Sequence, residues 1–187
     1  MPLRQPLILA SISPRRKELL RNAKFPFKVM PSGLAEPPPG MLDPATYTRK
    51  LALAKAELVA KRLTKGIVVG ADTVVVHRGQ ILGKPTDFAD ACRILSRLQG
   101  TTHRVVTAIA LVDAASGKKK VAHTASAVTM RRLGLAEIAR YARKHPDKAG
   151  AYAVQGKKDP VILKIKGSYT NVVGLPMELL KKLLRGF

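Results

Sequence analysis

Asp72 is the residue whose surroundings most strongly suggest chemistry. It lies in the most strand-like stretch of the chain, the apolar run 67–76, although only 12 residues are acidic against 34 Lys and Arg. A charged carboxylate buried in such a run is costly unless a cation or a metal ion compensates it. Asp72 could hold a divalent ion, act as a general base on water, or do both. It could equally cap a local turn or pair with a buried lysine, so the residue alone leaves the question open.

The first predicted helix begins like an anion-binding site. Ser13 suits the N-cap position and Pro14 the first helical position. The unpaired N–H groups of a helix start attract anions, and Arg15 and Arg16 add donors whose geometry fits phosphate. Cations at a helix start oppose the helix dipole, so local stability alone would not favour them. The alternative is an exposed basic first turn.

Three other residues carry weaker signals. Lys84, between Gly83 and Pro85, could point a compact charge at a phosphate, but such loops are common. Gln155 can donate to and accept from the edge of a base, although the glycines near it could form ordinary tight turns. Lys55 lies on a predicted helix, where a lysine is usually solvated. The four histidines lack ligand-like spacing, and no Walker A, GxGxxG, GxSxG or HExxH motif is present.

The composition indicates a folded protein with an aliphatic core. Hydrophobic residues make up 46% of the 187 residues, while aromatic residues make up 4% and Trp is absent. This apolar content argues against disorder despite the charge. No run approaches the ~20 apolar residues of a membrane span, and the N-terminal residues lack the features of a signal peptide. The lone Cys92 cannot form an internal disulfide and is expected to be buried; it fits a cytoplasmic location.

The net charge of +22 raises the possibility of a nucleic-acid partner. The charge is spread along the chain, however, and forms only short clusters at 118–120 and 181–182. No aromatic RNA-binding motif, zinc-finger spacing or basic heptad array accompanies it. Nucleic-acid binding is therefore expected to be incidental and limited to low salt.

Strands and helices are predicted to alternate along the chain. Periodicity and turn residues predict strands over 7–10, 67–76, 104–112, 121–130 and 161–166, and a hairpin over 67–82. They predict helices from Pro14, over 44–63, from Phe88 to Leu98, over 135–144 and from near Pro176. One face of the second helix should contain Tyr47, Leu51, Ala54 and Leu58. The antiparallel hairpins argue against a regular doubly wound sheet.

Several segments together resemble the Maf family of nucleotide pyrophosphatases. The matching stretches occur in the order of that family and span almost the whole chain: 9–20 (LASISPRRKELL), 53–56 (LAKA), 70–75 (GADTVV), 82–85 (LGKP), 147–152 (DKAGAY), 155–156 (QG) and 171–176 (NVVGLP).

The resemblance implies an α/β fold in which helices flank a long, twisted, mixed sheet, as in inosine-triphosphatase-type proteins. It implies one domain over 1–187, with two lobes and a central cleft. The cleft should collect the first helix start, the end of the Asp72 strand, the Lys84 loop and the Gln155 loop. A homodimer is the family expectation.

The resemblance also implies an activity, the hydrolysis of a nucleoside triphosphate to its monophosphate and pyrophosphate, assisted by Mg²⁺ or Mn²⁺. Asp72 then corresponds to the catalytic acid that activates water, and Glu36 to its partner near the metal ion. The residues implied to contact phosphate are Ser11, Arg16, Lys55 and Lys84. Those implied to select the base are Arg15, Thr73 and Gln155.

The segment 70–73 (GADT) is similar to the family branch that acts on dTTP and UTP. The branch that acts on 7-methyl-GTP typically has Ser-Asp-Gln at this strand, which is absent here. Two alternatives remain: a pyrophosphatase with another nucleotide substrate, and a non-enzymatic regulator of septum formation and cell division. A binding module would not need the full set of acids and cations, so the set favours an enzyme.

Overall fold

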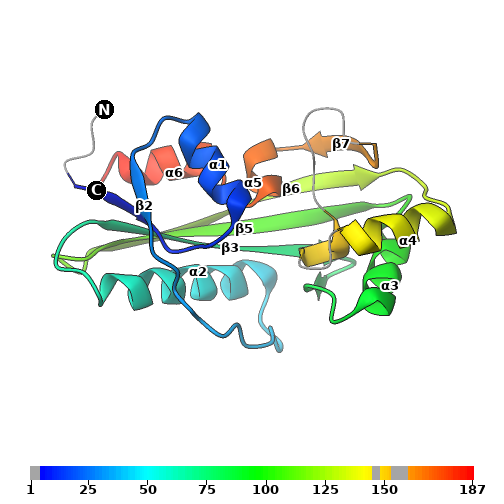
Figure 1. Cartoon of the computed structure of the whole chain (residues 1–187), viewed down its shortest axis with the longest axis horizontal. Helices are drawn as coiled ribbons and strands as arrows, with labels where there is room; N and C mark the ends of the chain where they lie inside the picture. Colours follow the sequence, from blue (N-terminus) through cyan, green and yellow to red (C-terminus); the bar gives the residue numbers. More distant parts are fainter. Residues whose placement is uncertain (1–4, 145–147, 153–159) are drawn as a thin grey trace.

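The computed structural model describes residues 5–144, 148–152 and 160–187, and these form an α/β fold around one mixed sheet (Figure 1). The strand order is β2-β1-β3-β5-β6-β7, and β4 pairs separately with β3. β1 runs parallel to β2 and β3, whereas the remaining pairs are antiparallel. The strands are β1 (Leu7–Leu9), β2 (Phe27–Val29), β3 (Ile67–His77), β4 (Gln80–Leu82), β5 (Thr102–Asp113), β6 (Lys119–Met130) and β7 (Ile162–Lys166). The expected mixed sheet is confirmed.

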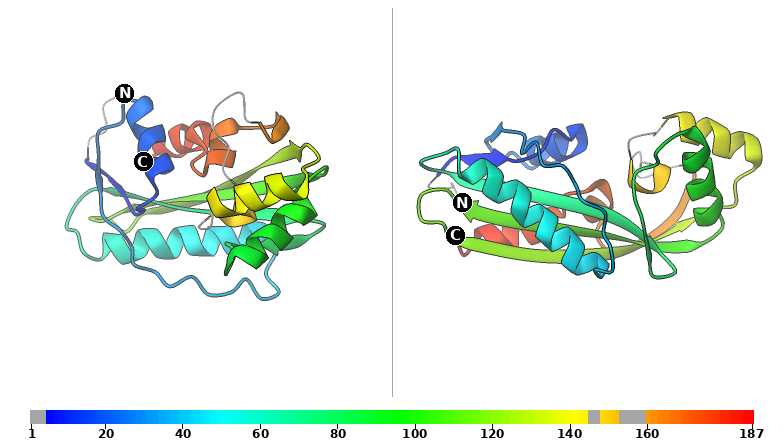
Figure 2. Two further views of the ribbon diagram at one scale, coloured as in Figure 1. Left: turned by 45° about the vertical axis from the view of Figure 1, so that its right-hand side comes forward. Right: turned by 90° about the horizontal axis from the view of Figure 1, so that it is seen from below.

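Helices cover both faces of this sheet. α2 crosses one face, α1, α5 and α6 lie over the other, and α3 and α4 pack at one end (Figures 1 and 2). None of the helices in the described ranges is long and apolar enough to cross a membrane. The helices are α1 (Pro14–Asn22), α2 (Pro44–Ala60), α3 (Phe88–Leu98), α4 (Leu135–Lys144), α5 (Tyr169–Val173) and α6 (Met177–Leu184), with a 3₁₀ turn η1 (Ala149–Ala151).

Successive side chains of β3 point to opposite faces of the sheet, as in any strand. Val68 and Val74 pack with α2 residues, whereas Ile67 and Val69 pack with residues of α1 and α6. The same alternation sends the polar neighbours in the middle of β3 to different sides. A site built around them must therefore extend around an edge of the strand.

One edge of β3 is open in its middle. β5 pairs along the other edge from Ile67 to Val76. On the open side, β1 pairs only with 67–69 and β4 only with 75–77, so no strand among the described residues covers 70–74. Asp72 lies in this gap, in mid-strand. The end of this strand was expected at the cleft, whereas the open part is its middle, because the strand continues to pair with β5 beyond Asp72.

α2 lies unusually close to the gap because Gly70 has no side chain. A Cβ at Gly70 would lie 2.1 Å from the carbonyl oxygen of Ala52, which is too close for any side chain. α2 ends at Ala60 rather than at residue 63. Its predicted face is also partly wrong, because Ala54 and Leu58 are only half-buried. The residues that contact the sheet lie one position further along, so that Lys55, expected to be solvated, is buried.

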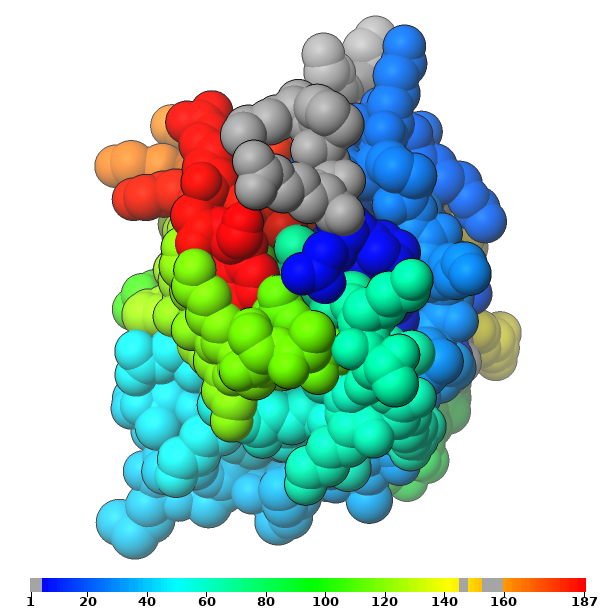
Figure 3. All heavy atoms as spheres, turned by 90° about the vertical axis from the view of Figure 1, so that its left-hand side faces the viewer, coloured from blue at the N-terminus to red at the C-terminus, as the bar shows by residue number. Residues whose placement is uncertain are grey.

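Other expectations need smaller corrections. The sequence pattern did not indicate the short elements β2 and α5. Phe88 is exposed, and Cys92 is only partly buried, because Ala91 and Ile94 form the packed face of α3. The end of the chain packs against the turn between β5 and β6, as Figure 3 shows. There the carbonyl oxygen of Gly186 accepts hydrogen bonds from the ammonium groups of two lysines, Lys118 and Lys120.

Candidate active site

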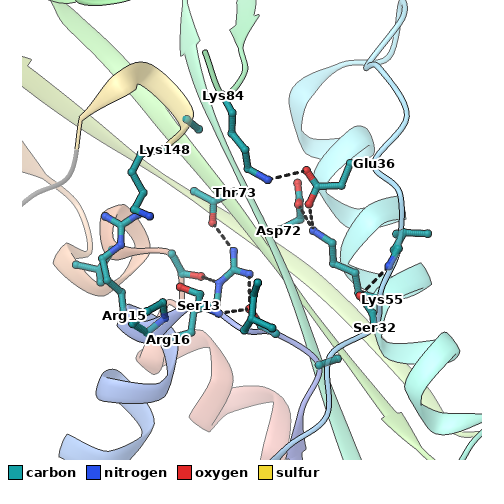
Figure 4. A pocket seen from close by; sticks show the side chains of 18 of the residues that line it. Ser13, Arg15, Arg16, Ser32, Glu36, Lys55, Asp72, Thr73, Lys84 and Lys148 are labelled. Atoms are coloured by element: carbon teal, nitrogen blue, oxygen red, sulfur yellow. Dashed lines mark hydrogen bonds and ion pairs between the residues drawn. The ribbon is translucent and has the colours of Figure 1, made fainter. Parts of the chain in front are cut away.

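A cavity of about 680 Å³ lies beside the open edge of β3 (Figure 4). Segments far apart in sequence line it, from the start of α1, the loop after β2, α2, β3, the loop after β4, η1 and α5. It brings together all of the predicted site residues that the structure describes: Ser11, Arg15, Arg16, Glu36, Lys55, Asp72, Thr73 and Lys84. Gln155 lies outside the described residues.

Two carboxylates share one buried lysine on the α2 side of β3. The ammonium group of Lys55 lies 2.7 Å from Oδ1 of Asp72 and 2.6 Å from Oε1 of Glu36. Only 7% of Lys55 and 5% of Asp72 are exposed. Both interpretations of Asp72 are thus compatible with the structure, since it pairs with a buried lysine and also faces a cavity. A buried pair with a third charged partner contributes little net stability, which favours a role beyond folding.

Glu36 comes from a long loop, and α2 fixes its position. The hydroxyl of Tyr47 donates a 2.8 Å hydrogen bond to the carbonyl of Pro37, next to Glu36. Lys84 approaches the second carboxylate oxygen of Glu36 at 3.2 Å. Burial alone would raise the pKa of Glu36, but its contacts with Lys55 and Lys84 outweigh this effect and hold the pKa below its ordinary value. Glu36 is therefore ionised at neutral pH.

The acid pair suits a metal ion that arrives with a polyphosphate. The described residues contain no cluster of three or more His, Cys, Asp or Glu able to form a cage for a metal. Mg²⁺, however, commonly uses only one or two carboxylates and completes its shell with phosphate oxygens and water. Asp72 and Glu36 provide those two carboxylates, and Lys55 balances their charge.

Arg16 occupies the other side of the gap. Its Nη1 donates to the carbonyl of Ala71, its Nε to the carbonyl of Gly174, and its Nη2 to the hydroxyl of Thr73, at 3.0, 2.8 and 3.1 Å. Ser11 accepts a further, longer hydrogen bond from Nη1. Burial lowers the pKa of this guanidinium, against the opposing effect of nearby Asp72. Because most of its donors bind protein atoms, Arg16 joins three segments here, and its phosphate contact stays a prediction.

Ser13 is the N-cap residue of α1 as predicted, but its side chain makes no capping hydrogen bond. Arg15 and Arg16 follow Pro14 in the first turn, and both line the cavity. The arginines are therefore not merely an exposed basic turn. They border the end of the cavity opposite to Lys84, as Figure 4 shows.

Thr73 points away from Asp72, to the face that carries α1 and α5. Its hydroxyl lies 3.0 Å from the hydroxyl of Thr107 on β5, which donates in turn to the carbonyl of Asn171 at 2.9 Å. Asn171 is completely buried and anchors α5 to the sheet through Val105 and Ser126. Sequence reasoning missed Thr107. Its signal was a polar residue within an apolar strand, which is weaker than that of Asp72 because threonine is common in strands.

Apolar side chains line the cavity beside Thr73. They are Val75, Val105, Val172 and Tyr152. The hydroxyl of Tyr152 lies 2.6 Å from Nε2 of His103, and burial together with nearby His77 lowers the pKa of His103 to about 4. His103, near the start of β5, is thus a neutral, buried partner of Tyr152. Both residues support the wall of the cavity.

The model of one protein family, described as Maf-like protein, matches residues 6–187. The chain belongs to the Maf-like family.

Relatives of this Maf-like chain extend over nearly its full length. A protein of Pelotomaculum thermopropionicum is 48% identical over 97% of this chain and 96% of its own length. Proteins of Moorella thermoacetica and Gloeobacter violaceus are 47% and 46% identical, over 97% of this chain and 94% and 95% of their own lengths. Each of the three is named dTTP/UTP pyrophosphatase.

Proposed function

We propose that this Maf-like protein hydrolyses dTTP and UTP to the nucleoside monophosphate and pyrophosphate. The observation that carries the proposal is the pair of carboxylates, Asp72 and Glu36, joined by Lys55 at the open edge of β3. The names of the relatives agree with this activity. The triphosphate would lie along the gap, between the acid pair and the start of α1.

Asp72 acts as the general base. It holds a water molecule beside the α-phosphorus and accepts its proton as the oxygen attacks. The bond between the α-phosphorus and the oxygen that bridges to the β-phosphorus breaks, and pyrophosphate leaves with the electron pair. A divalent cation, Mg²⁺ or Mn²⁺, held by Asp72, Glu36 and the triphosphate would neutralise charge on the reacting phosphates.

The cations of the cavity stabilise the same charge without taking part in proton transfer. Lys84 lines the cavity, is 58% exposed at its side chain and pairs with Glu36 at 3.2 Å, so it can turn toward the leaving pyrophosphate. Arg15, at the opposite end, can contact the nucleotide from the start of α1. Pyrophosphate is a stable anion that needs no histidine to protonate it, which fits the lack of a histidine in the described lining of the cavity.

A panel of nucleotides tests the proposal by pyrophosphate release. It should contain dTTP, UTP, dCTP, CTP, the purine triphosphates and 7-methyl-GTP, each with Mg²⁺ and with Mn²⁺. We expect dTTP and UTP to be the best substrates. Release from 7-methyl-GTP alone would assign the protein to another substrate class, and release from none would favour a binding role in cell division.

Asp72→Asn tests the mechanism. Since the amide cannot accept the proton of water, we expect kcat to fall by a factor of about 10³ or more while nucleotide binding persists. Asp113→Asn is the matched control, because Asp113 is a carboxylate at the far end of the sheet that accepts hydrogen bonds in a turn. Undiminished turnover by Asp72→Asn would contradict the assignment of the base.

A further inference from the structure

Thr73 is part of a directed chain of hydrogen bonds. Arg16 donates to Thr73 at 3.1 Å, Thr73 and Thr107 lie 3.0 Å apart, and Thr107 lies 2.9 Å from the carbonyl of Asn171. Two of these three contacts have only one possible direction. A guanidinium group can only donate, and a carbonyl oxygen can only accept.

The third contact then has one direction as well. Thr107 has a single hydroxyl hydrogen, and it is given to the carbonyl of Asn171. Thr107 must therefore accept from Thr73, whose own hydrogen points at β5. Thr107 is completely buried, so no water competes for these groups.

The consequence for a ligand is a fixed polarity at Thr73. A hydroxyl has one hydrogen and two lone pairs. The hydrogen of Thr73 is committed to Thr107, and one lone pair takes the N–H of Arg16. Only the second lone pair remains. Thr73 lines the cavity, so toward a bound molecule it can accept a hydrogen bond and cannot donate one.

This polarity distinguishes the pyrimidine bases when N3 of the base faces Thr73. Uracil and thymine carry a hydrogen on N3, whereas N3 of cytosine is an acceptor. An acceptor facing cytosine N3 would leave two buried lone pairs opposed and unpaired, which is the kind of mismatch that rejects a substrate strongly. Val75 and Val105 lie across from each other beside Thr73 and give the base ring an apolar surface.

We propose that Thr107 is a positioning residue that sets the direction of the Thr73 hydroxyl and thereby selects bases with an imide N–H. The inference rests on the proposed function, since it concerns the base of the same substrate. Thr107 contacts no substrate atom. It acts by occupying the hydrogen of Thr73, so that uracil and thymine are accepted and cytosine is rejected.

Thr107→Val tests this role. Valine has nearly the shape of threonine, but it releases the Thr73 hydrogen, which can then turn toward cytosine N3. We expect the ratio of kcat/KM for UTP over CTP to fall at least about tenfold, mainly through KM for CTP. Thr107→Ser, which keeps the hydroxyl, should restore the ratio of the wild type.

Thr102→Val is the matched control. Thr102 is also on β5 and also pairs with a threonine hydroxyl, that of Thr129 at 2.9 Å, but on an exposed part of the sheet. The Thr102→Val variant should keep the wild-type ratio of kcat/KM for UTP over CTP. An unchanged ratio in folded Thr107→Val would overturn the inference, because a merely structural residue lowers turnover of both nucleotides alike.

A measurement on the wild type covers the case in which Thr107→Val does not fold. UTP methylated at N3 has lost the hydrogen, and we expect its kcat/KM to be lower than that of UTP by a factor of about 100 or more. Comparable turnover of the methylated nucleotide and UTP would overturn the inference while leaving the proposed function intact. If the wild type released pyrophosphate from no nucleotide, the proposed function would fail instead, and competition between UMP and CMP for binding would decide whether the selection exists.

Discussion

The two faces of β3 carry different kinds of polar groups, although the residues that begin them, Asp72 and Thr73, are adjacent. On the α2 face, Asp72 belongs to a group of full charges held by ion pairs of 2.6–3.2 Å. On the opposite face, Thr73 belongs to a chain in which hydroxyl and carbonyl groups follow one guanidinium. Charged groups bind phosphate and metal ions, whereas hydroxyl groups of fixed direction form hydrogen bonds with the edge of a base. The open edge of the strand lets one ligand reach both.

Because the two faces hold different groups, the rate of hydrolysis and the selection of the base should be separately alterable by substitution. Substitutions on the α2 face should lower turnover of every nucleotide by the same factor. Substitutions in the hydrogen-bond chain through Thr107 should change the ratio of kcat/KM for UTP over CTP more than the turnover of UTP. A single variant that changed both to a similar degree would break the separation.

After Asp72→Asn, Lys55→Met should have the largest effect on turnover. It leaves two carboxylates facing each other without their shared cation, and it removes a positive charge from the phosphate path. We expect kcat/KM for UTP to fall by a factor of about 10²–10³, with an unchanged UTP/CTP ratio. Steady-state kinetics with both nucleotides measure this.

Lys119→Met is the control for the charge removed, since Lys119 forms an exposed ion pair with Glu57. It should have kinetics close to those of the wild type. If it lost as much activity as Lys55→Met, net charge rather than the acid pair would explain the loss. A changed UTP/CTP ratio in Lys55→Met would argue against separate faces.

The sequence predicted one face of this comparison better than the other. Asp72 was conspicuous because a carboxylate is rare in an apolar strand. Thr107 was not noticed, because threonine is common in strands and its importance depends on two other segments. The sequence also did not show that Asp72 and Glu36 share Lys55, since this depends on the path of the loop that holds Glu36. The opposite orientations of Asp72 and Thr73 follow from the alternation of side chains along a strand.

Gly70→Ala should have an intermediate effect that is confined to the α2 face. The added methyl group would meet the backbone of Ala52 at 2.1 Å, so α2 must move away and carry Lys55 with it. We expect the free energy of unfolding to fall by about 1–3 kcal/mol and kcat to fall as well. The UTP/CTP ratio should stay the same.

Denaturant unfolding and kinetics at a temperature where the variant is folded measure this prediction. Gly83→Ala is the control, since a Cβ at Gly83 would meet no atom within 4 Å. A Gly70→Ala variant with the stability of the wild type would show that the close approach of α2 is not needed. A loss of selectivity with kcat intact would contradict the link between α2 and the rate.

His103→Gln should have the smallest effect at neutral pH. Its effect on the free energy of unfolding should appear as the pH is lowered. Burial lowers the pKa of His103 to about 4, whereas an unfolded histidine titrates near its ordinary value of 6.5. Between these values the unfolded chain binds the additional proton, so the wild type loses stability as the pH falls through this window. The loss from His103 amounts to at most about 3 kcal/mol. Glutamine removes it and can still bind the hydroxyl of Tyr152.

Urea unfolding at pH 7 and at pH 4.5 separates the effect of the substitution at neutral pH from the loss of stability in acid. His123→Gln, at an exposed position on β6, is the control. The acid loss should shrink in His103→Gln and persist in His123→Gln; His77, whose pKa is lowered mainly by burial, accounts for part of what remains. An equal acid loss in all three proteins would show that His103 accepts its proton without unfolding. Protonated His103 would then place a charge behind Tyr152 in the wall of the cavity. Base selection on that side of β3 would depend on pH, whereas the hydrogen-bond chain through Thr107 alone predicts no such dependence.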